Sequence, residues 1–329
     1  MLAMTSHGLY CPTGDFYIDP SRGVERAVVT HAHSDHARRG SKLYYCAASG
    51  EGLLRGRLGA QIAVRPFKFG EPFELGGVRV SFHPAGHILG SAQVRLEREG
   101  RVWAVSGDFK REPDPTCEPF ELVRCDVFIT EATFGTPGFR WDKAADLGGQ
   151  IRDWWRENAA RGANSVLFAY SLGKTQRVLG LLRPYARSAV YCHPAASALT
   201  DCYRKEGIAL AQTRCLSALA PGSRLRGELV IGPQSLLESE YAAFLGDDFE
   251  TAFASGWMAR GPGGYGRGFL LSDHADWDDL VLTARETGAR TVYVLHRGEG
   301  ALVRHLRSLG IDAWPINQLG AGADQLSLL

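Results

Sequence analysis

The chain has no long apolar run, since no stretch of its sequence approaches the ~20 apolar residues that a membrane-spanning helix needs. Its first residues, 1–11, lack the positive and apolar regions of a secretion signal. The seven cysteines are odd in number and include no Cys-x-x-Cys pair, which is typical of reduced thiols. We therefore expect a cytoplasmic protein without a membrane partner.

An excess of charge is also absent overall, because the net charge is only +1. The charges are unevenly distributed, however. Between Arg152 and Glu228 there are twelve Lys and Arg residues and five acidic ones, so this segment carries +7 and the remainder −6. A basic segment of this kind suits a polyanionic partner, although a solvated helical face would produce the same excess.

The pattern of apolar residues and glycines predicts the α/β class. The chain, at 329 residues, has room for about two domains. Short β-branched runs separated by glycines predict strands at 16–18, 27–29, 61–64, 78–82, 92–96, 102–105 and 127–130. Helices are then expected at 144–160, 174–185, 195–206, 276–286 and 300–309. They alternate with strands at 165–169, 189–192, 229–231, 251–254, 268–271 and 291–295.

Three imidazoles and a carboxylate lie within six residues, in the sequence His31-Ala32-His33-Ser34-Asp35-His36. They follow an apolar run at 27–29 that predicts a strand. Because residues two apart on an extended segment point to the same side, we expect His31 and His33 to share one ion. We expect Asp35 and His36 to begin a helix, where adjacent side chains diverge and can face a second ion.

Further metal-binding side chains follow later strands. His87 and Asp108 stand in Gly-rich turns, and His296 follows the run at 291–295. Together the candidate ligands are five imidazoles and two carboxylates, without a thiolate. This set suits two zinc ions that each keep a position for solvent, and manganese fits it as well.

The residues from 31 to 36 match the His-x-His-x-Asp-His signature of the metallo-β-lactamase superfamily, which the chain resembles over residues 15–110. Asp19 in Tyr17-Ile18-Asp19-Pro20 is similar to the first motif of that superfamily, and His87 and Asp108 are similar to its third and fourth. The resemblance implies an αββα sandwich. It also implies the following sites: His31, His33 and His87 on one metal, Asp35, His36 and His296 on the other, Asp108 bridging both, and Asp19 orienting a ligating histidine.

Later segments resemble the β-CASP branch of nucleases, which act on DNA or RNA. Glu131 in Thr130-Glu131-Ala132-Thr133-Phe134-Gly135 resembles the first β-CASP motif, His274 in Leu271-Ser272-Asp273-His274-Ala275-Asp276 the second, and His296 the third. The resemblance implies a metallo-β-lactamase domain at 1–135 and 257–329. An inserted α/β β-CASP domain that binds the nucleic-acid strand would occupy 136–256, which contains the whole basic segment.

Cys11-Pro12 followed by the segment from Asp15 to Pro20, and Phe134-Gly135 before a short insert, resemble the bacterial DNA-ligase-associated exonucleases of that branch. This resemblance implies a DNA exonuclease that acts in repair beside a ligase and a helicase. His296 is the residue that RNA-processing members carry, so an RNA substrate stays open. The intact ligand set argues against a non-catalytic nucleic-acid-binding scaffold. The later motifs and the basic segment argue against a glyoxalase-like or lactonase-like hydrolase.

The expected mechanism is hydrolysis of a phosphodiester by a water activated between two metal ions. Asp35 is the candidate proton acceptor. His274, with Glu131 to set its tautomer, is the candidate proton donor or phosphate ligand. The candidate contacts to flanking phosphates are Lys174, Ser171, Thr133 and Ser255. Gly173-Lys174-Thr175 is not a P-loop, because the upstream glycine position holds Phe168, but it predicts an anion site at a helix start.

Overall fold

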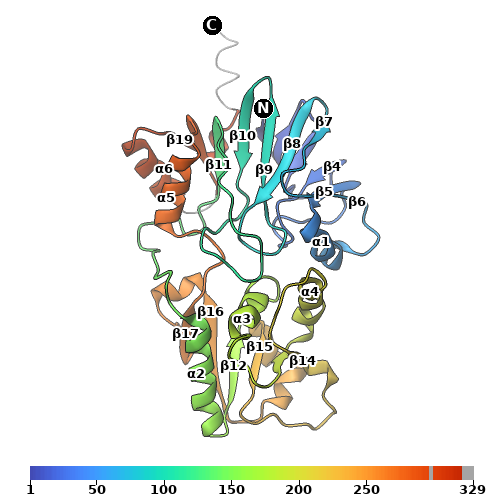
Figure 1. Cartoon of the computed structure of the whole chain (residues 1–329), viewed down its shortest axis with the longest axis vertical. Coiled ribbons are helices and arrows are strands. Elements are labelled where there is room, and N and C mark those ends of the chain that lie inside the picture. The colour runs from blue at the N-terminus through green and yellow to red at the C-terminus, as the bar shows by residue number, and fades with distance from the viewer. Residues whose placement is uncertain (296–298, 321–329) are drawn as a thin grey trace. The chain divides into compact units, whose positions relative to one another are not determined.

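The computed structural model describes residues 1–295 and 299–320, and it divides into two compact units (Figure 1). Unit 1 comprises Met1–Pro113, Cys117–Arg140 and His274–Leu329, and unit 2 comprises Asp114–Thr116 and Trp141–Asp273. The observed bounds differ from the expected insert at 136–256. Unit 2 begins somewhat later, continues as far as Asp273 and takes in the short segment 114–116.

Unit 1 contains two sheets. The first, sheet A, has six strands in the order β1-β2-β3-β4-β5-β6. The strands are β1 (Ala3–Thr5), β2 (Gly8–Cys11), β3 (Phe16–Ile18), β4 (Arg26–Val28), β5 (Leu43–Ala47) and β6 (Val64–Phe67). The first three are antiparallel, and β3 to β6 are parallel. Helix α1 (Glu51–Leu58) follows β5.

The second sheet of unit 1, sheet B, has seven strands in the order β19-β18-β11-β10-β9-β8-β7. The strands are β7 (Phe73–Leu75), β8 (Val78–Pro84), β9 (Ala92–Arg98), β10 (Arg101–Val105), β11 (Val127–Thr130), β18 (Thr291–Val294) and β19 (Asp312–Pro315). Helices α5 (Trp277–Glu286) and α6 (Glu299–Ser308) belong to the same unit. Because β8, β10, β11 and β18 all run in one direction, their carboxyl ends meet at one edge of the sheet.

The apolar side chains of the two sheets explain the layering of unit 1. Phe16 and Ile18 of sheet A pack with Phe82, Val94 and Ile129 of sheet B in one buried cluster. The other face of each sheet is covered by helices. Leucines of α1 pack on sheet A, and leucines of α5 and α6 pack on sheet B. The αββα sandwich that the sequence predicts is therefore confirmed.

Unit 2 is a parallel α/β domain. Its sheet, sheet C, has six strands in the order β14-β13-β15-β12-β16-β17, and every pair is parallel. The strands are β12 (Asn164–Phe168), β13 (Val190–Cys192), β14 (Thr213–Cys215), β15 (Leu229–Gly232), β16 (Phe249–Ser255) and β17 (Arg267–Leu270). The helices are α2 (Leu147–Ala160), α3 (Lys174–Leu182) and α4 (Pro194–Lys205). Ile151 and Trp154 of α2 and Val178 and Leu182 of α3 are buried together with residues of the sheet.

The predicted helices and strands occur with shifts of a few residues at their ends. The pattern missed the short strands β1, β2, β7, β14 and β19, and it also missed β5 and α1. No helix among the described residues has both the length and the apolar content to cross a bilayer.

Candidate metal centre

The candidate ligands stand in loops that follow strands. His31 and His33 come shortly after β4, His87 follows β8, and Asp108 follows β10. Gly107 has a φ of 56°, and a Cβ there would lie 2.8 Å from Cβ of Thr30. The glycine before Asp108 therefore lets the loop after β10 approach the loop after β4.

The segment after His33 forms a turn, so the expected helix at Asp35 and His36 is wrong. The backbone N–H groups of His36 and Ala37 both donate to the carbonyl oxygen of His33, at 3.2 and 2.8 Å, but no further helical bond follows. Sequence spacing alone did not distinguish a single turn from the first turn of a helix.

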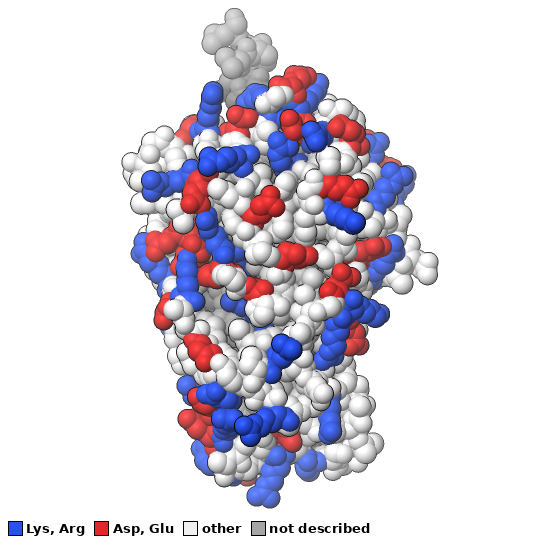
Figure 2. All heavy atoms as spheres, viewed as in Figure 1, with Lys and Arg blue, Asp and Glu red and all other residues white. Residues whose placement is uncertain are grey.

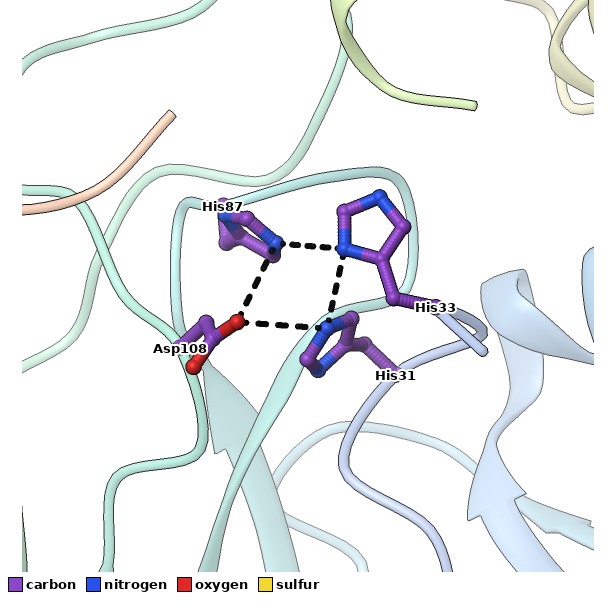
Figure 3. A group of neighbouring side chains, drawn as sticks. All are labelled: His31, His33, His87 and Asp108. Carbon is purple, nitrogen blue, oxygen red and sulfur yellow. Dashed lines mark hydrogen bonds and ion pairs between the residues drawn. The ribbon is translucent and has the colours of Figure 1, made fainter. Parts of the chain in front are cut away.

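Three imidazoles and one carboxylate point toward one another (Figure 3). The Nδ1 atom of His33 lies 3.1 Å from Nε2 of His31 and 3.0 Å from Nε2 of His87. The Oδ2 atom of Asp108 lies 3.6 Å from the former Nε2 and 3.8 Å from the latter. The ligand atoms of these four residues all lie within 4.8 Å of one another.

His36 approaches the same carboxylate from another side. Its Nε2 atom lies 3.4 Å from Oδ2 of Asp108, and its Nδ1 atom lies 2.7 Å from Oδ2 of Asp19. Asp19 also accepts hydrogen bonds from the backbone N–H of Thr30 at 2.8 Å and from its hydroxyl at 2.6 Å. Asp19 has a φ of 45°, a left-handed conformation that is costly for a non-glycine residue. The aspartate is thus fixed where it orients the His36 ring.

The electrostatics of the centre follow from this arrangement. Burial, together with the neighbouring His36 and His87, holds the pKa of His31 well below its usual value. Burial also opposes charge on His36, but Asp108 and Asp19 outweigh it and raise the pKa of this ring. Burial likewise disfavours an ionised Asp108, yet His36 and His274 keep its pKa well below the usual value.

A second group of candidate ligands shares Asp108. It consists of Asp108, Glu131 and His274, again with ligand atoms within 4.8 Å of one another. The Nδ1 atom of His274 lies 2.9 and 3.1 Å from the two carboxylate oxygens of Glu131 and 4.0 Å from Oδ2 of Asp108. Glu131 is buried and also accepts a 2.7 Å hydrogen bond from the backbone N–H of Phe109. The paired residues of the expected mechanism are therefore in contact.

The donor set fits a divalent cation. Three imidazole nitrogens lie close together: Nδ1 of His33 is within hydrogen-bonding distance of Nε2 of both His31 and His87. This single nitrogen can donate or accept only one hydrogen bond, so it cannot pair with both. The buried Oδ1 atom of Asp108 has no hydrogen-bond partner among residues 1–295 and 299–320. A cation at this point would satisfy both the nitrogens and the carboxylate, which are ligands that zinc and manganese accept.

The structure gives less support for two of the predicted ligands, Asp35 and His296. The carboxylate of Asp35 is 69% exposed, and its Oδ2 atom lies 3.8 Å from Nε2 of His36. His296 lies outside the described residues. The ligand set that the resemblance implies for the second metal therefore stays a prediction.

The predicted phosphate contacts differ in their surroundings. Thr133 and Ser171 are half-buried. Ser255 is buried at the end of β16, where its hydroxyl accepts a 3.3 Å hydrogen bond from the backbone N–H of Trp257. Lys174 is also buried, and its Nζ atom lies 2.6 Å from a carboxylate oxygen of Asp273. Asp273 therefore already neutralises the ammonium group of Lys174, so the predicted phosphate contact would have to compete with this ion pair.

Two exposed aromatic residues near these positions were missed. Tyr170 is 54% exposed after β12, and Trp257 is 44% exposed after β16, the neighbouring strand of sheet C. Carboxyl ends of adjacent parallel strands meet at one edge, and exposed rings can stack on unpaired bases. The sequence places both residues directly after predicted strands, and this position could have indicated a role at the sheet edge. It does not show that their side chains are exposed.

No family model matches the chain. A protein of Opitutus terrae named "Probable DNA ligase" is 35% identical over 327 residues, which make up 96% of this chain and 31% of that protein. An "RNase J-like protein" of Methanocaldococcus jannaschii is 25% identical over 204 residues, covering 55% of this chain and 48% of its own length. The chain thus spans less than half of either relative.

Further matches, over smaller parts of the chain, are named ribonucleases or endoribonucleases. Among solved structures, a protein of unknown function from Enterococcus faecalis superposes with a TM-score of 0.52 and 13% identity. The superposition covers 83% of this chain and 76% of the other, and at this identity it supports the fold alone. The nuclease names and the αββα sandwich around a His/Asp cluster together point to the metallo-β-lactamase superfamily and, within it, to the β-CASP nucleases.

Proposed function

We propose that the chain is a metal-dependent phosphodiesterase that hydrolyses DNA as an exonuclease. The observation that carries this proposal is the carboxylate of Asp108, which belongs to two ligand groups at once. One group is rich in imidazole and the other contains the His274–Glu131 pair. The shared carboxylate therefore places the His274–Glu131 pair, as a candidate proton donor, directly beside the candidate metal ligands of the imidazole-rich group.

When bound, divalent cations lower the pKa of water and neutralise the charge of a phosphate in its transition state. The protein residues supply the proton transfers. Asp35 is largely exposed beside the cluster, where it can accept a proton from the attacking water. His274 contacts Glu131 and Asp108 through Nδ1, so its Nε2 atom lies on the other side of the ring. From there it can donate a proton to the leaving oxygen.

DNA is the substrate favoured by the Opitutus terrae relative, whose match covers 96% of this chain. The relative that covers almost the whole chain carries the name of a probable DNA ligase, although the chain spans only 31% of it. A segment similar to this chain thus occurs in one polypeptide with whatever gives that relative its name. This supports a role in DNA repair beside a ligase. A helicase partner is proposed from the sequence resemblance alone, and a cytoplasmic location from the sequence features described above.

RNA cleavage is the second candidate, because several shorter matches carry ribonuclease names. Matched DNA and RNA strands, labelled at the 5′ or the 3′ end and incubated with Zn²⁺, Mn²⁺ or EDTA, separate the two candidates. We expect stepwise shortening of DNA, no cleavage in EDTA, and weaker action on RNA. Preferential cleavage of RNA would replace the DNA assignment.

A variant tests whether the His/Asp cluster is responsible. Asp108→Asn should lose both bound metal, measured by elemental analysis, and cleavage. Asp278→Asn is the matched control, because this aspartate is 60% exposed on α5 and pairs with Arg140 outside the cluster. Normal metal content and cleavage in the Asp108 variant would refute the proposal. A wild-type protein that binds metal but cleaves neither polymer would favour the scaffold alternative.

A further inference from the structure

Unit 2 carries a cavity of about 250 Å³ that is separate from the residues discussed so far. It is lined by side chains of α2 and of the loops that precede β13 and β15. We call it the α2 cavity. Because sheet C is parallel, loops before its strands lie at the amino edge. Tyr170 and Ser171 follow β12, and Ser255 is the last residue of β16, so all three belong to the opposite, carboxyl edge.

The cavity is positively charged. Its lining includes three arginines and one glutamate, with a formal charge of +2. Arg152 is engaged, since its guanidinium donates two hydrogen bonds of 2.7 and 2.8 Å to Asp153. Arg156 and Arg187 are exposed and make no hydrogen bond or ion pair through their side chains within the described part of the chain. Figure 2 shows Lys and Arg side chains over the region of α2, with carboxylates among them. Two guanidinium groups are therefore available to an anion.

Two aromatic rings in the cavity are held in place. The Trp155 indole N–H donates a 2.9 Å hydrogen bond to the carbonyl oxygen of Gly227. The Tyr185 hydroxyl donates a 3.0 Å hydrogen bond to Asp146, and the Arg152 guanidinium lies 4.7 Å from the centre of the tyrosine ring. Rings fixed through their polar atoms offer a rigid surface on which a planar group can stack at little entropic cost.

We propose that the α2 cavity binds one nucleotide of a nucleic-acid strand, with its phosphate on Arg156 and Arg187 and its base against Trp155 or Tyr185. Arginine forks match phosphate oxygens, and aromatic rings bind any base through its face. The volume of about 250 Å³ is below the ~300–1,000 Å³ of pockets for drug-sized ligands, which suits one nucleotide rather than a large cofactor. Glu228 in the same wall limits the cavity to one phosphate and can accept a hydrogen bond from a base amino group.

This inference rests on the proposed function, because the strand would be the substrate, but its test is independent of cleavage. The full-length double variant Arg156→Ala/Arg187→Ala is compared with wild type for binding a fluorescein-labelled single-stranded DNA in EDTA, by anisotropy over a salt series. The matched control is Arg183→Ala/Arg224→Ala, which removes two exposed arginines of unit 2 outside the cavity. Thymidine monophosphate and inorganic phosphate serve as competitors.

The cavity variant should bind the strand at least tenfold more weakly, while the control changes less than twofold. Each phosphate contact to a single strand contributes about 0.7 to the slope of log affinity against log salt, so losing the one phosphate in the cavity should lower the slope by roughly 0.7. In cleavage of long strands, the cavity variant should raise KM and leave kcat unchanged.

Three results would overturn the inference. Equal losses in both variants would show only general electrostatic attraction, and an unchanged cavity variant would exclude the cavity as a contact. If the monophosphate bound wild type as tightly as the strand and lost affinity in the cavity variant, the ligand would be a free nucleotide instead. A wild-type protein that binds DNA through the cavity but cleaves no strand would refute the proposed function alone.

Discussion

Replacing Asp19 by Asn tests the orientation of His36 without removing a candidate ligand. The carboxylate of Asp19 accepts three hydrogen bonds, two from Thr30 at 2.8 and 2.6 Å and one from the His36 ring at 2.7 Å. An amide of the same shape has only one acceptor oxygen. Its NH₂ group must therefore face either Thr30 or the imidazole, and one of these contacts is lost.

The size of the effect follows from what such partners contribute. Outer carboxylates that orient a metal-binding histidine change metal affinity by about 10- to 100-fold when they are mutated. At about 1.4 kcal/mol per factor of ten, this corresponds to roughly 1.4–2.7 kcal/mol at one metal position. Ligands that Asp19 does not contact, such as His33 and His87, should retain their affinity. We therefore expect one weakened site beside one normal site.

Competitive titration with a chromogenic zinc chelator measures both affinities, and cleavage of labelled DNA measures the consequence. Asp15→Asn is a closely matched control. Asp15 also has a left-handed conformation, with a φ of 50°, but its carboxylate contacts Tyr10 and Arg26 at the surface. If Asp19→Asn bound zinc as tightly as Asp15→Asn does, the orienting role of Asp19 would be refuted.

Three further predictions concern other parts of the molecule. His274→Ala should keep its metal content but lose about 10²–10⁴-fold in turnover, whereas His305→Ala should keep both; normal single-turnover cleavage would reject the proton-donor role. Lys174→Met should lower the unfolding free energy by about 1.5–3 kcal/mol, less than for a buried charge without any counter-charge, because Asp273 loses Lys174 at 2.6 Å but keeps Arg177 at 3.5 Å. The double variant with Asp273→Asn should recover part of this loss in calorimetry, and an undiminished Tm in the single variant would contradict the reasoning. In EDTA, burial opposes charge on His36, but neighbouring carboxylates raise its pKa well above 6.5. The stabilisation from this charge is complete below pH 6.5 and disappears as the pH rises through the raised pKa, so Tm should fall over that range. A flat Tm profile there would argue against a charged ring.

The sequence predicted the cluster well because its geometry is local or follows from strand ends. His31 and His33 are two residues apart after β4, and His87 and Asp108 follow strands whose carboxyl ends share one edge of sheet B. Once the strands are placed, the backbone leaves little freedom in where these side chains point. The roles of the individual residues stay predictions, since the contacts do not identify which atom binds which ion.

The sequence predicted other features poorly because they depend on distant partners. The short strands at the sheet edges have too few apolar residues to show a period. Lys174 follows a glycine at a helix start, which is typical of an anion site, but the anion is Asp273, ninety-nine positions later in the chain. The α2 cavity combines residues from three separate segments, and only the folded parallel sheet brings them together.

The orientation of two imidazoles separates the candidate ligands from the candidate acid. His36 turns Nδ1 to Asp19 and Nε2 to Asp108, so its two nitrogens connect an outer carboxylate with the cluster. His274 instead presents Nδ1 to Glu131 and, at 4.0 Å, to Asp108. A carboxylate behind a ring raises the basicity of the opposite nitrogen in both cases. For His36 that nitrogen faces Asp108 of the candidate metal centre, whereas for His274 it faces away from the nearest oxygens of Glu131 and Asp108. The same pairing of imidazole and carboxylate therefore supports metal binding at one position and proton transfer at the other.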